Sequence, residues 1–422
     1  MKFRKPFLPA LLLLLARFLS APPNGFGQEQ EKEKEQAKGV LAEPTDAVEV
    51  RAQIAKIEKL LPQLPDRAAA LYLLAISRQH LGETLEALRL LKDCLALREG
   101  FDPSGSLSLK VLKGTKEFDD MVSAVHRDYP VVAQSHLAFL SEEKDLVPEG
   151  LAYDSKRDVF YMSSLNRRKI VKFSPEGRVS DFVPAIRDKL LPILGIRIDP
   201  SDATVWANSW SEDSERSELL HFDASGKLLE RYSPDTSAKH GFNDLVIRNS
   251  GEILLTDSIA NQVLRFDRRT RVFSPISVLR ALSAPNGIAL AEDGRQLFIA
   301  DDLGVVRADL NTDVSNDVNP GPRNTLAGID GLYWHKGSLV AVQNGIGSPR
   351  IMAFRLSKDA SRVTQTTVLE NRTSFTVSPT TGAIHGTDFY FISNGQGDNM
   401  NGDKIIDVTK LAPVRIGVVR IP

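Results

Sequence analysis

One short phrase recurs six times in the second part of the chain, and this repetition limits the possible folds more than any other feature. Each copy contains a short apolar strand pattern, a turn and a second apolar strand, as in "PEGLAYDSKRDVFYMSS" and "PNGIALAEDGRQLFIADD", and a third strand usually follows. The residues before the first strands are spaced by 45, 49, 43, 44 and 55 positions: Glu149, Leu194, Asn243, Asn286, Asp330 and His385. Three or four strands in each unit of about 45 residues are typical of a β-propeller. We therefore expect an all-β, six-bladed propeller over residues 134–422.

The last copy lacks an outer strand before the chain ends at Pro422. The segment "QSHLAFLSE", residues 134–142, is an unassigned strand pattern just before the first copy. It could complete the last blade, and closing the ring in this way would remove an open sheet edge.

A helical period replaces the strand period over residues 46–130, where Leu and Ala recur every three or four positions. The stretch "LYLLAISRQHLGETLEALRLLKDCLAL" places Leu81-Gly82 between two such runs. This pattern predicts a small helical domain similar to a tetratricopeptide hairpin. A single repeat cannot bury its own apolar face, so the domain either caps the propeller or binds a protein partner.

The first 27 residues have a basic start, an apolar run over 7–16 and small residues near Gly27, which together predict a secretory signal peptide. An uncleaved anchor is the alternative, although Arg17 interrupts a run shorter than the roughly 20 residues of a membrane span. Residues 28–45 begin with a charged, repetitive run and predict a solvated linker. Cys94 is the single cysteine, so no internal disulfide can form, and we expect a secreted or periplasmic protein without a membrane span after cleavage.

Charge and motifs exclude several functions. The net charge is −1, with no excess of cations to neutralise a phosphate backbone, so nucleic acid is not an expected partner. The sequence contains no phosphate-binding glycine loop, zinc-protease motif or serine-hydrolase elbow. Residues 397–407, "GDNMNGDKIID", fail the calcium-loop spacing because Met400 and Gly402 stand where oxygen ligands belong.

The first strand of each propeller blade lines the central axis, so the six aligned residues should meet at one mouth of the tunnel. Four of them, Glu149, Asn243, Asn286 and Asp330, carry side-chain oxygens, which calcium prefers. Magnesium and manganese also accept oxygen ligands. Asn-Gly and Asp-Gly are also ordinary turn dipeptides, so turn formation is the alternative at Asn286 and Asp330. We nevertheless expect one divalent cation at this mouth.

The segments "PEGLAYD", "FNDLVI", "PNGIALAEDGRQLFIADD" and "GIDGLYW" resemble those of the regucalcin/gluconolactonase family and its six-bladed relatives, the diisopropylfluorophosphatases and paraoxonases. The resemblance covers residues 134–422. It implies a catalytic calcium held by Glu149, Asn243, Asn286 and Asp330, and hydrolysis of lactones, esters or organophosphates. Asp330 would then serve as general base or nucleophile.

Several positions depart from the pattern of these relatives. Leu194 and Ser209 stand where paraoxonase-like members place catalytic histidines, and Tyr333 stands where a ligand of a second, structural calcium would be expected. His385 and His240 are the remaining candidates for moving protons, although a lone histidine is often structural.

The loops between second and third strands should determine the substrate, because they open on the same face as the cation. They contribute seven candidate residues in addition to the long segment 394–413: Arg167, Arg168, Asn208, Trp210, Asp257, Asp301 and Asn344. The two arginines would bind an anionic substrate or form a solvated rim.

Two functions follow from the sequence. The first is a secreted, calcium-dependent hydrolase of a small lactone or ester. The second is a non-catalytic propeller in which calcium joins the blades while the helical domain and rim bind a protein or carbohydrate. An open coordination site would distinguish them, since a purely structural cation does not need one.

Overall fold

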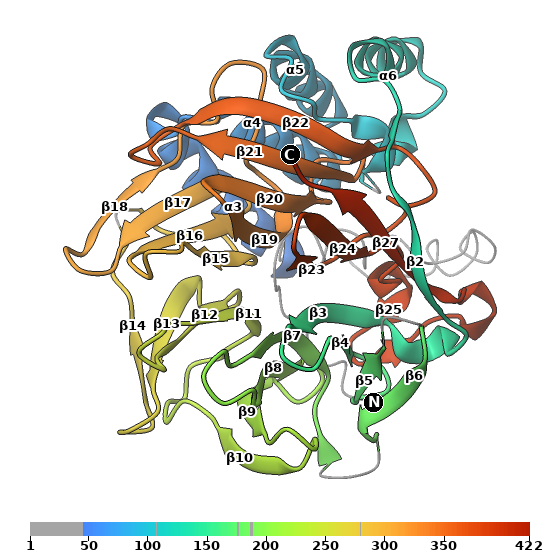
Figure 1. The fold of residues 1–422 in the computed structure, drawn as a ribbon. Coiled ribbons are helices and arrows are strands. Elements are labelled where there is room, and N and C mark those ends of the chain that lie inside the picture. Colours follow the sequence, from blue (N-terminus) through green and yellow to red (C-terminus); the bar gives the residue numbers. More distant parts are fainter. Residues whose placement is uncertain (1–44, 107, 175–176, 186–188, 279) are drawn as a thin grey trace, which may run out of the picture.

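The computed structural model describes residues 45–422, except 107, 175–176, 186–188 and 279, and shows six sheets arranged in a ring with helices beside them (Figure 1). The predicted signal peptide and nearly all of the predicted linker lie outside the described residues. Within the described part of the chain, no helix has the length and apolar content needed to cross a membrane. The six-bladed propeller is confirmed.

Each blade is an antiparallel sheet of at least four strands, and the first strands of successive blades contact one another around the axis. Blade one contains β3 (Pro148–Asp154), β4 (Val159–Ser164), β5 (Ile170–Phe173) and β6 (Val179–Val183). Blade two contains β7 (Ile193–Ile198), β8 (Val205–Ser211), β9 (Arg216–Phe222) and β10 (Leu228–Tyr232). Blade three contains β11 (Phe242–Ile247), β12 (Ile253–Asp257), β13 (Gln262–Asp267) and β14 (Val272–Pro275).

Blades four to six follow the same plan with additions. Blade four contains β15 (Ile288–Leu290), β16 (Gln296–Asp301), β17 (Gly304–Asp309) and β18 (Val314–Asp317). Blade five contains β19 (Ile329–His335), β20 (Ser338–Gln343), β21 (Arg350–Leu356), β22 (Val363–Asn371) and, at its edge, β1 (Val132–Ala133). Blade six contains β23 (Gly382–His385), β24 (Asp388–Ile392) and β27 (Val414–Arg420), and the chain between the last two forms the hairpin β25 (Met400–Asn401) and β26 (Lys404–Ile405).

The predicted closure of the ring is confirmed. Strand β2 (His136–Ser141) pairs antiparallel with β27, with His136 opposite Val418 and Ser141 opposite Val414. Blade six is therefore built from both ends of the propeller segment, and β2 covers the edge that β27 would otherwise expose. Phe139 on β2 anchors this pairing, because its ring lies 5.3 Å from that of Phe160 in blade one.

Four helices precede the propeller in the described part of the chain: α3 (Thr45–Leu60), α4 (Arg67–His80), α5 (Thr84–Ala96) and α6 (Lys116–Asp128). Short 3₁₀ turns occur at Leu61–Gln63, Pro103–Gly105 and Leu109–Leu112. Helix α4 begins where Asp66 accepts a 2.9 Å hydrogen bond from the Ala69 amide, and a turn with positive φ at Gly82 separates it from α5. The predicted helical domain is present, whereas its relation to tetratricopeptide repeats stays a prediction.

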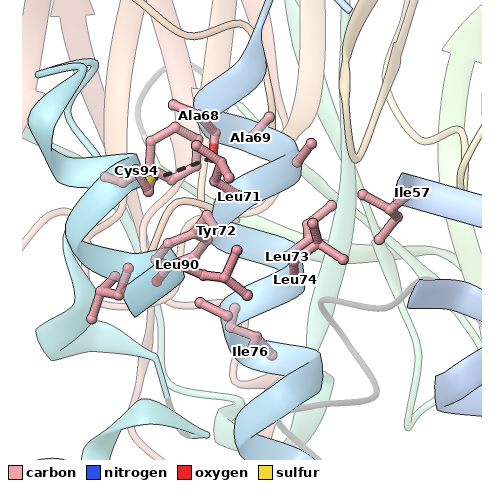
Figure 2. Close-up of a cluster of buried hydrophobic side chains, with 14 of the residues drawn as sticks. Ile57, Ala68, Ala69, Leu71, Tyr72, Leu73, Leu74, Ile76, Leu90 and Cys94 are labelled. Atoms are coloured by element: carbon pink, nitrogen blue, oxygen red, sulfur yellow. Dashed lines mark hydrogen bonds between the residues drawn. The ribbon is translucent and has the colours of Figure 1, made fainter. Parts of the chain in front are cut away.

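The helices and the propeller share one hydrophobic core. Figure 2 shows its helical part, in which the buried Cys94 lies beside Ala68, with its Sγ 3.4 Å from the Ala68 carbonyl oxygen, while Leu73 and Leu74 lie on the side of α4 toward Ile57. The same cluster includes Leu303, Ala327 and Ile346 from loops of blades four and five. The helical segment is therefore docked on the propeller through apolar contacts, and α4 is buried over most of its length.

Polar contacts fix the position of the docked helices. Asp66 accepts hydrogen bonds from the Thr325 hydroxyl, at 2.5 Å, and from the Leu326 amide. The Asp102 amide donates to the Ile346 carbonyl at 2.9 Å. On α3, the Lys56 ammonium donates to the Leu282 carbonyl at 2.9 Å. These contacts all involve loops at the tunnel mouth where the first strands begin, so the helices partly cover that mouth.

Candidate active site at the tunnel mouth

Glycines allow the first strands of neighbouring blades to approach one another at the mouth. Gly150, Gly195 and Gly287 each follow the mouth residue of their blade, and a Cβ atom on any of them would lie within 2.5 Å of the next blade's mouth-residue carbonyl oxygen. Since real Cβ atoms do not come so close, only glycine fits at these positions. This close approach brings the mouth residues of adjacent blades together.

The blade-six mouth residue is Thr381, and the alignment of His385 with this ring was wrong. Thr381 precedes Gly382 at the start of β23, and its hydroxyl donates a 2.5 Å hydrogen bond to the Glu149 carbonyl. His385 lies at the opposite end of β23, where it pairs with Asp388 beside the hairpin turn. There its Nε2 lies 3.1 Å from the hydroxyl of Tyr153. His385 is therefore remote from Glu149 and Asp330 and is unsuited to act with them.

The four predicted metal ligands all lie at the same mouth. Glu149, Asn243 and Asp330 are 7%, 6% and 5% exposed, and Asn286 is half-buried. Each occupies the second position of an inner strand, except Asn286, which precedes β15 by two residues. Glu149, Asn286 and Asp330 line one cavity, whereas Asn243 lies beside it. The structure thus brings the predicted set to one place.

Asp330 has an unusual environment for a carboxylate. The Asn344 amide nitrogen donates a 2.6 Å hydrogen bond to Asp330 Oδ2, while Oδ1 is buried without a hydrogen-bond partner among the described residues. Burial raises the pKa of Asp330 to about 7, although the hydrogen bond from Asn344 and the nearby Asn286 side chain oppose this, and the charge of Asp244 adds to it. Without a cation, this carboxyl group is therefore easily protonated.

The residues present fit a divalent cation that prefers oxygen ligands. Asn286 Oδ1, like Asp330 Oδ1, is buried without a hydrogen-bond partner among the described residues. Asn243 donates a 3.3 Å hydrogen bond from Nδ2 to the Ser258 hydroxyl, which leaves its side-chain carbonyl oxygen for another partner. Buried acceptors without donors are costly unless a cation or water satisfies them. Over the described ranges, no three His, Cys, Asp or Glu side chains cluster as a metal site, so binding would depend on the two amide oxygens.

The positively charged side chain of Arg197 lies in the tunnel just inside the mouth. The guanidinium of Arg197, on β7, donates to Asp244 at 2.8 Å and lies over the Tyr333 ring, 5.5 Å from its centroid. The charge of Asp244 helps to keep the pKa of Arg197 raised, in spite of burial. Arg197 and Tyr333 thus place a guanidinium and a phenol ring in this part of the tunnel.

A cavity of about 420 Å³ lies above the mouth. The propeller contributes Leu165, Trp210 and Asn344 to its lining, and the hairpin segment after β24 contributes Met400 and Asp403. The helical segment contributes a further wall, with Tyr72 and Ile76 on α4 and Lys110 on the third 3₁₀ turn. A cavity of this size, with apolar walls and a few convergent polar groups, is typical of a small-molecule site.

Three of the seven predicted substrate residues line the cavity: Trp210, Asp301 and Asn344. Asn208 does not; it is buried, and its amide donates to the Asp244 carbonyl at 3.0 Å. Asp257 is fully buried and accepts a 2.8 Å hydrogen bond from the Gly241 amide, which organises its loop. Asn208 and Asp257 therefore lie in strands β8 and β12 rather than in the loops where they were predicted, and their side chains serve structural contacts.

The two arginines of blade one are not part of the cavity wall. Arg167 forms an ion pair with Asp145 at 2.6 Å, and Arg168 pairs with Asp403 at 3.1 Å. Both side chains are partly exposed. The rim interpretation is therefore preferred to an anion-binding role for Arg167 and Arg168, and Arg168 also fixes the hairpin that carries Asp403.

His240 is also separated from the cavity. Its Nδ1 lies 2.5 Å from Asp257 Oδ2, and its ring is 6.0 Å from that of Phe242. This contact between His240 and Asp257 holds the segment before β11 in place. A role for His240 in moving protons at Asp330 is not supported by this position, because the ring does not line the cavity.

Sequence reasoning missed several cavity residues. Asp302 follows the predicted Asp301 and lines the cavity together with it, and Lys110 and Tyr72 come from the helical segment. The acidic pair at the end of β16 was a visible signal for Asp302. No local pattern could indicate Tyr72 or Lys110, because their approach depends on how the helices dock.

No protein-family model matches the chain, and no curated protein matches it. Among solved structures, an inactive virginiamycin B lyase from Staphylococcus aureus with quinupristin is similar at 16% identity and a TM-score of 0.49, covering 68% of this chain and 100% of that one. A gluconolactonase from Xanthomonas campestris is similar at 14% identity and a TM-score of 0.45, covering 65% and 86%. A PQQ-bound aldose sugar dehydrogenase from Streptomyces coelicolor is similar at 14% identity and a TM-score of 0.47, covering 68% of this chain and 100% of that one. Likeness at this level concerns the fold and assigns no activity.

Proposed function

We propose that the chain is an exported, calcium-dependent hydrolase of small lactones or esters, with its active site in the cavity above Asp330. The observation that carries the proposal is the buried Oδ1 of Asp330, which has no hydrogen-bond partner among the described residues and belongs to a residue lining an open cavity. An acceptor in this state is suited to a cation or to the proton of a water molecule. Export follows the prediction from residues 1–27.

Glu149, Asn243, Asn286 and Asp330 are the residues that would hold the cation. Two carboxylates balance its double charge, and two neutral amides leave it electron-poor. Bound there, a divalent cation supplies positive charge that stabilises the oxyanion formed when an acyl carbonyl is attacked.

Asp330 is the proposed general base. A water oxygen attacks the acyl carbon while Asp330 accepts the proton of that water. The bond between the acyl carbon and the alkoxy oxygen then breaks, and the leaving alkoxide takes up a proton, so that a carboxylate and an alcohol result. Asn344 holds Oδ2 of Asp330 by its 2.6 Å hydrogen bond, which keeps the carboxyl plane fixed. Direct attack by the carboxylate remains the alternative role.

The cavity favours a hydrolase over a propeller in which calcium only joins the blades. A structural cation would be enclosed by protein ligands, whereas Glu149, Asn286 and Asp330 line a space of about 420 Å³. The helical segment forms a wall of this space, so its docking does not require a separate protein partner.

Hydrolysis by the mature protein can be followed in a pH-stat with aldonolactones, acyl-homoserine lactones and aryl esters. We expect turnover of at least one class with calcium, loss of turnover with a chelator, and recovery when calcium is restored. Protein shown to contain calcium that hydrolyses no member of the panel would contradict the hydrolase proposal and favour the non-catalytic alternative.

A further inference from the structure

The cavity has a strongly acidic lining, which limits the charge of its substrate. Among the residues that the structure describes, seven carboxyl side chains line it, against the single ammonium group of Lys110. Arg280 neutralises Asp301 through two hydrogen bonds, of 2.5 and 2.9 Å, and Arg168 pairs with Asp403. A divalent cation at the mouth would balance Glu149 and Asp330. Among the described residues of the cavity wall, the carboxyl groups of Asp302 and Asp398 then remain in excess over Lys110.

Asp302 is the buried member of this excess. It is 6% exposed, lines the cavity and makes no ion pair with any described residue. Its Oδ2 accepts a 3.2 Å hydrogen bond from the Ser283 hydroxyl. The charge of Lys56 favours the ionised form of Asp302, but the Lys56 ammonium makes its hydrogen bond to the Leu282 carbonyl and no hydrogen bond to Asp302. Burial without a cation is unfavourable for a carboxylate, so Asp302 lacks the partner that its environment requires.

Apolar and aromatic side chains complete the same cavity. Ile76 on α4, Leu165 and Met400 provide apolar surface, and the partly exposed Trp210 presents an aromatic ring. Aromatic faces attract organic cations as well as apolar groups. The combination differs from that of a site for an anionic sugar or phosphate, for which arginine donors would be expected in the wall.

We propose that the cavity binds a substrate with an apolar body and a positively charged amine, the amine lying at Asp302. This inference rests on the proposed hydrolase function and adds the class of its substrate, an amine-bearing ester or lactone. The acidic wall also repels the carboxylate that hydrolysis produces, which favours product release. The helical segment then contributes to specificity, because it supplies Ile76 and Tyr72 to the wall.

Three probes of similar shape test this proposal without requiring turnover: 2-phenylethylammonium, 2-phenylethanol and phenylacetate. Binding to the calcium-loaded mature protein is measured by calorimetry at pH 9. We expect the ammonium ion to bind at least about tenfold more tightly than the alcohol, and phenylacetate most weakly. Equal affinities, or no detectable binding of the ammonium ion, would overturn the proposal.

Two variants test which carboxyl group causes the preference for the ammonium ion over the alcohol. Asp302→Asn should reduce the preference for the ammonium ion over the alcohol to less than about threefold, since it removes a buried carboxylate and keeps its shape. Asp398→Asn removes an exposed carboxylate from the same cavity and should preserve most of the preference. If both variants lose the preference equally, or if Asp302→Asn keeps it, Asp302 is not the site of the amine.

The experiments distinguish a failure of the hydrolase proposal from a failure of the amine-site proposal. Protein that binds the ammonium probe but hydrolyses no ester would retain this ligand class and contradict the hydrolase. Calcium-dependent hydrolysis that proceeds equally well with neutral and amine-bearing esters would support the hydrolase and contradict the amine site.

Discussion

The Asn344 amide nitrogen donates a 2.6 Å hydrogen bond to Asp330 and a 2.9 Å hydrogen bond to the Pro379 carbonyl. These two contacts use both protons of the amide, so the orientation of Asn344 is fixed by the protein. Because Asn344 engages Oδ2 of Asp330, the carboxyl group has one held oxygen and one, Oδ1, without a described hydrogen-bond partner. This asymmetry is suited to a base whose reactive oxygen must keep its direction.

Replacement of Asn344 by leucine should lower kcat by about 10- to 100-fold with little change in KM, because Asp330 loses its positioning donor. The hydrogen bond also opposes the rise in the pKa of Asp330, so the pH profile of kcat should move to higher pH. The measurement is a kcat and KM profile on the best ester of the panel. Asn166→Leu, which removes an amide bonded to the Asp145 carbonyl in blade one, is the control. An unchanged profile for Asn344→Leu would exclude the positioning role.

Replacement of Asp330 by asparagine should lower turnover by about 100-fold or more, the usual loss for an acid-base group. Calcium binding must be measured on the same variant by calorimetry, since Asp330 is proposed both as ligand and as base. At saturating calcium, unchanged turnover would remove Asp330 from the chemistry. Asp398→Asn, which alters another carboxyl group of the cavity, should retain turnover within a few-fold.

The repeat spacing was sufficient to predict six blades, the closing strand and the mouth residues of five blades. Blade six was misaligned because His385-Gly386 imitates the dipeptide of the other mouths. Gly386 instead has φ of +64° in the hairpin turn at the far end of β23, and Gly382 is the glycine that packs beside the neighbouring strand. A turn glycine and a close-packing glycine cannot be distinguished by spacing alone.

The helical wall of the cavity could not be predicted from periodicity. Asp66 and Thr325 are separated by 259 positions, yet their side chains meet at 2.5 Å. The sequence indicates which helix faces are apolar, but it does not indicate which propeller loops they will cover. For the same reason, the roles of Asn208 and Asp257 changed once their neighbours were known.

The docking of the helices should depend on Gly347. A Cβ atom there would lie 1.7 Å from the Asp102 carbonyl oxygen, and φ is +95°. We expect Gly347→Ala to reduce the free energy of unfolding by about 3 kcal/mol or more, combining backbone strain with a steric clash. Gly386→Ala is the matched control, since φ is +64° and nothing lies within 4 Å of the added atom, so it carries only the strain. Urea unfolding compares the two, and equal losses would contradict a tight contact at Gly347.

The half-buried Glu99 and the buried Asp302 should make stability decrease with rising pH. Burial and the neighbouring Asp66 raise the pKa of Glu99 to about 9, and burial together with Asp301 raises that of Asp302 to about 8. Above their ordinary pKa values of 4.5 and 3.8, the unfolded chain loses these protons while the folded protein keeps them. The unfolded state therefore binds fewer protons, and the free energy of unfolding falls as pH rises until the folded pKa values are passed. Their contribution is complete at low pH and is lost by about pH 9.

Urea titrations of calcium-free protein at pH 5, 7 and 9 measure this dependence. The double variant Glu99→Gln with Asp302→Asn should show a smaller decrease between pH 5 and pH 9 than the parent protein, because neither replacement ionises. Glu117→Gln with Asp398→Asn alters two exposed acids and should leave the decrease unchanged. Since Glu99 lies at the helical interface and Asp302 in the cavity wall, each single variant should remove part of the effect. A slope unaffected by the double variant would show that these carboxyl groups are already ionised in the folded protein.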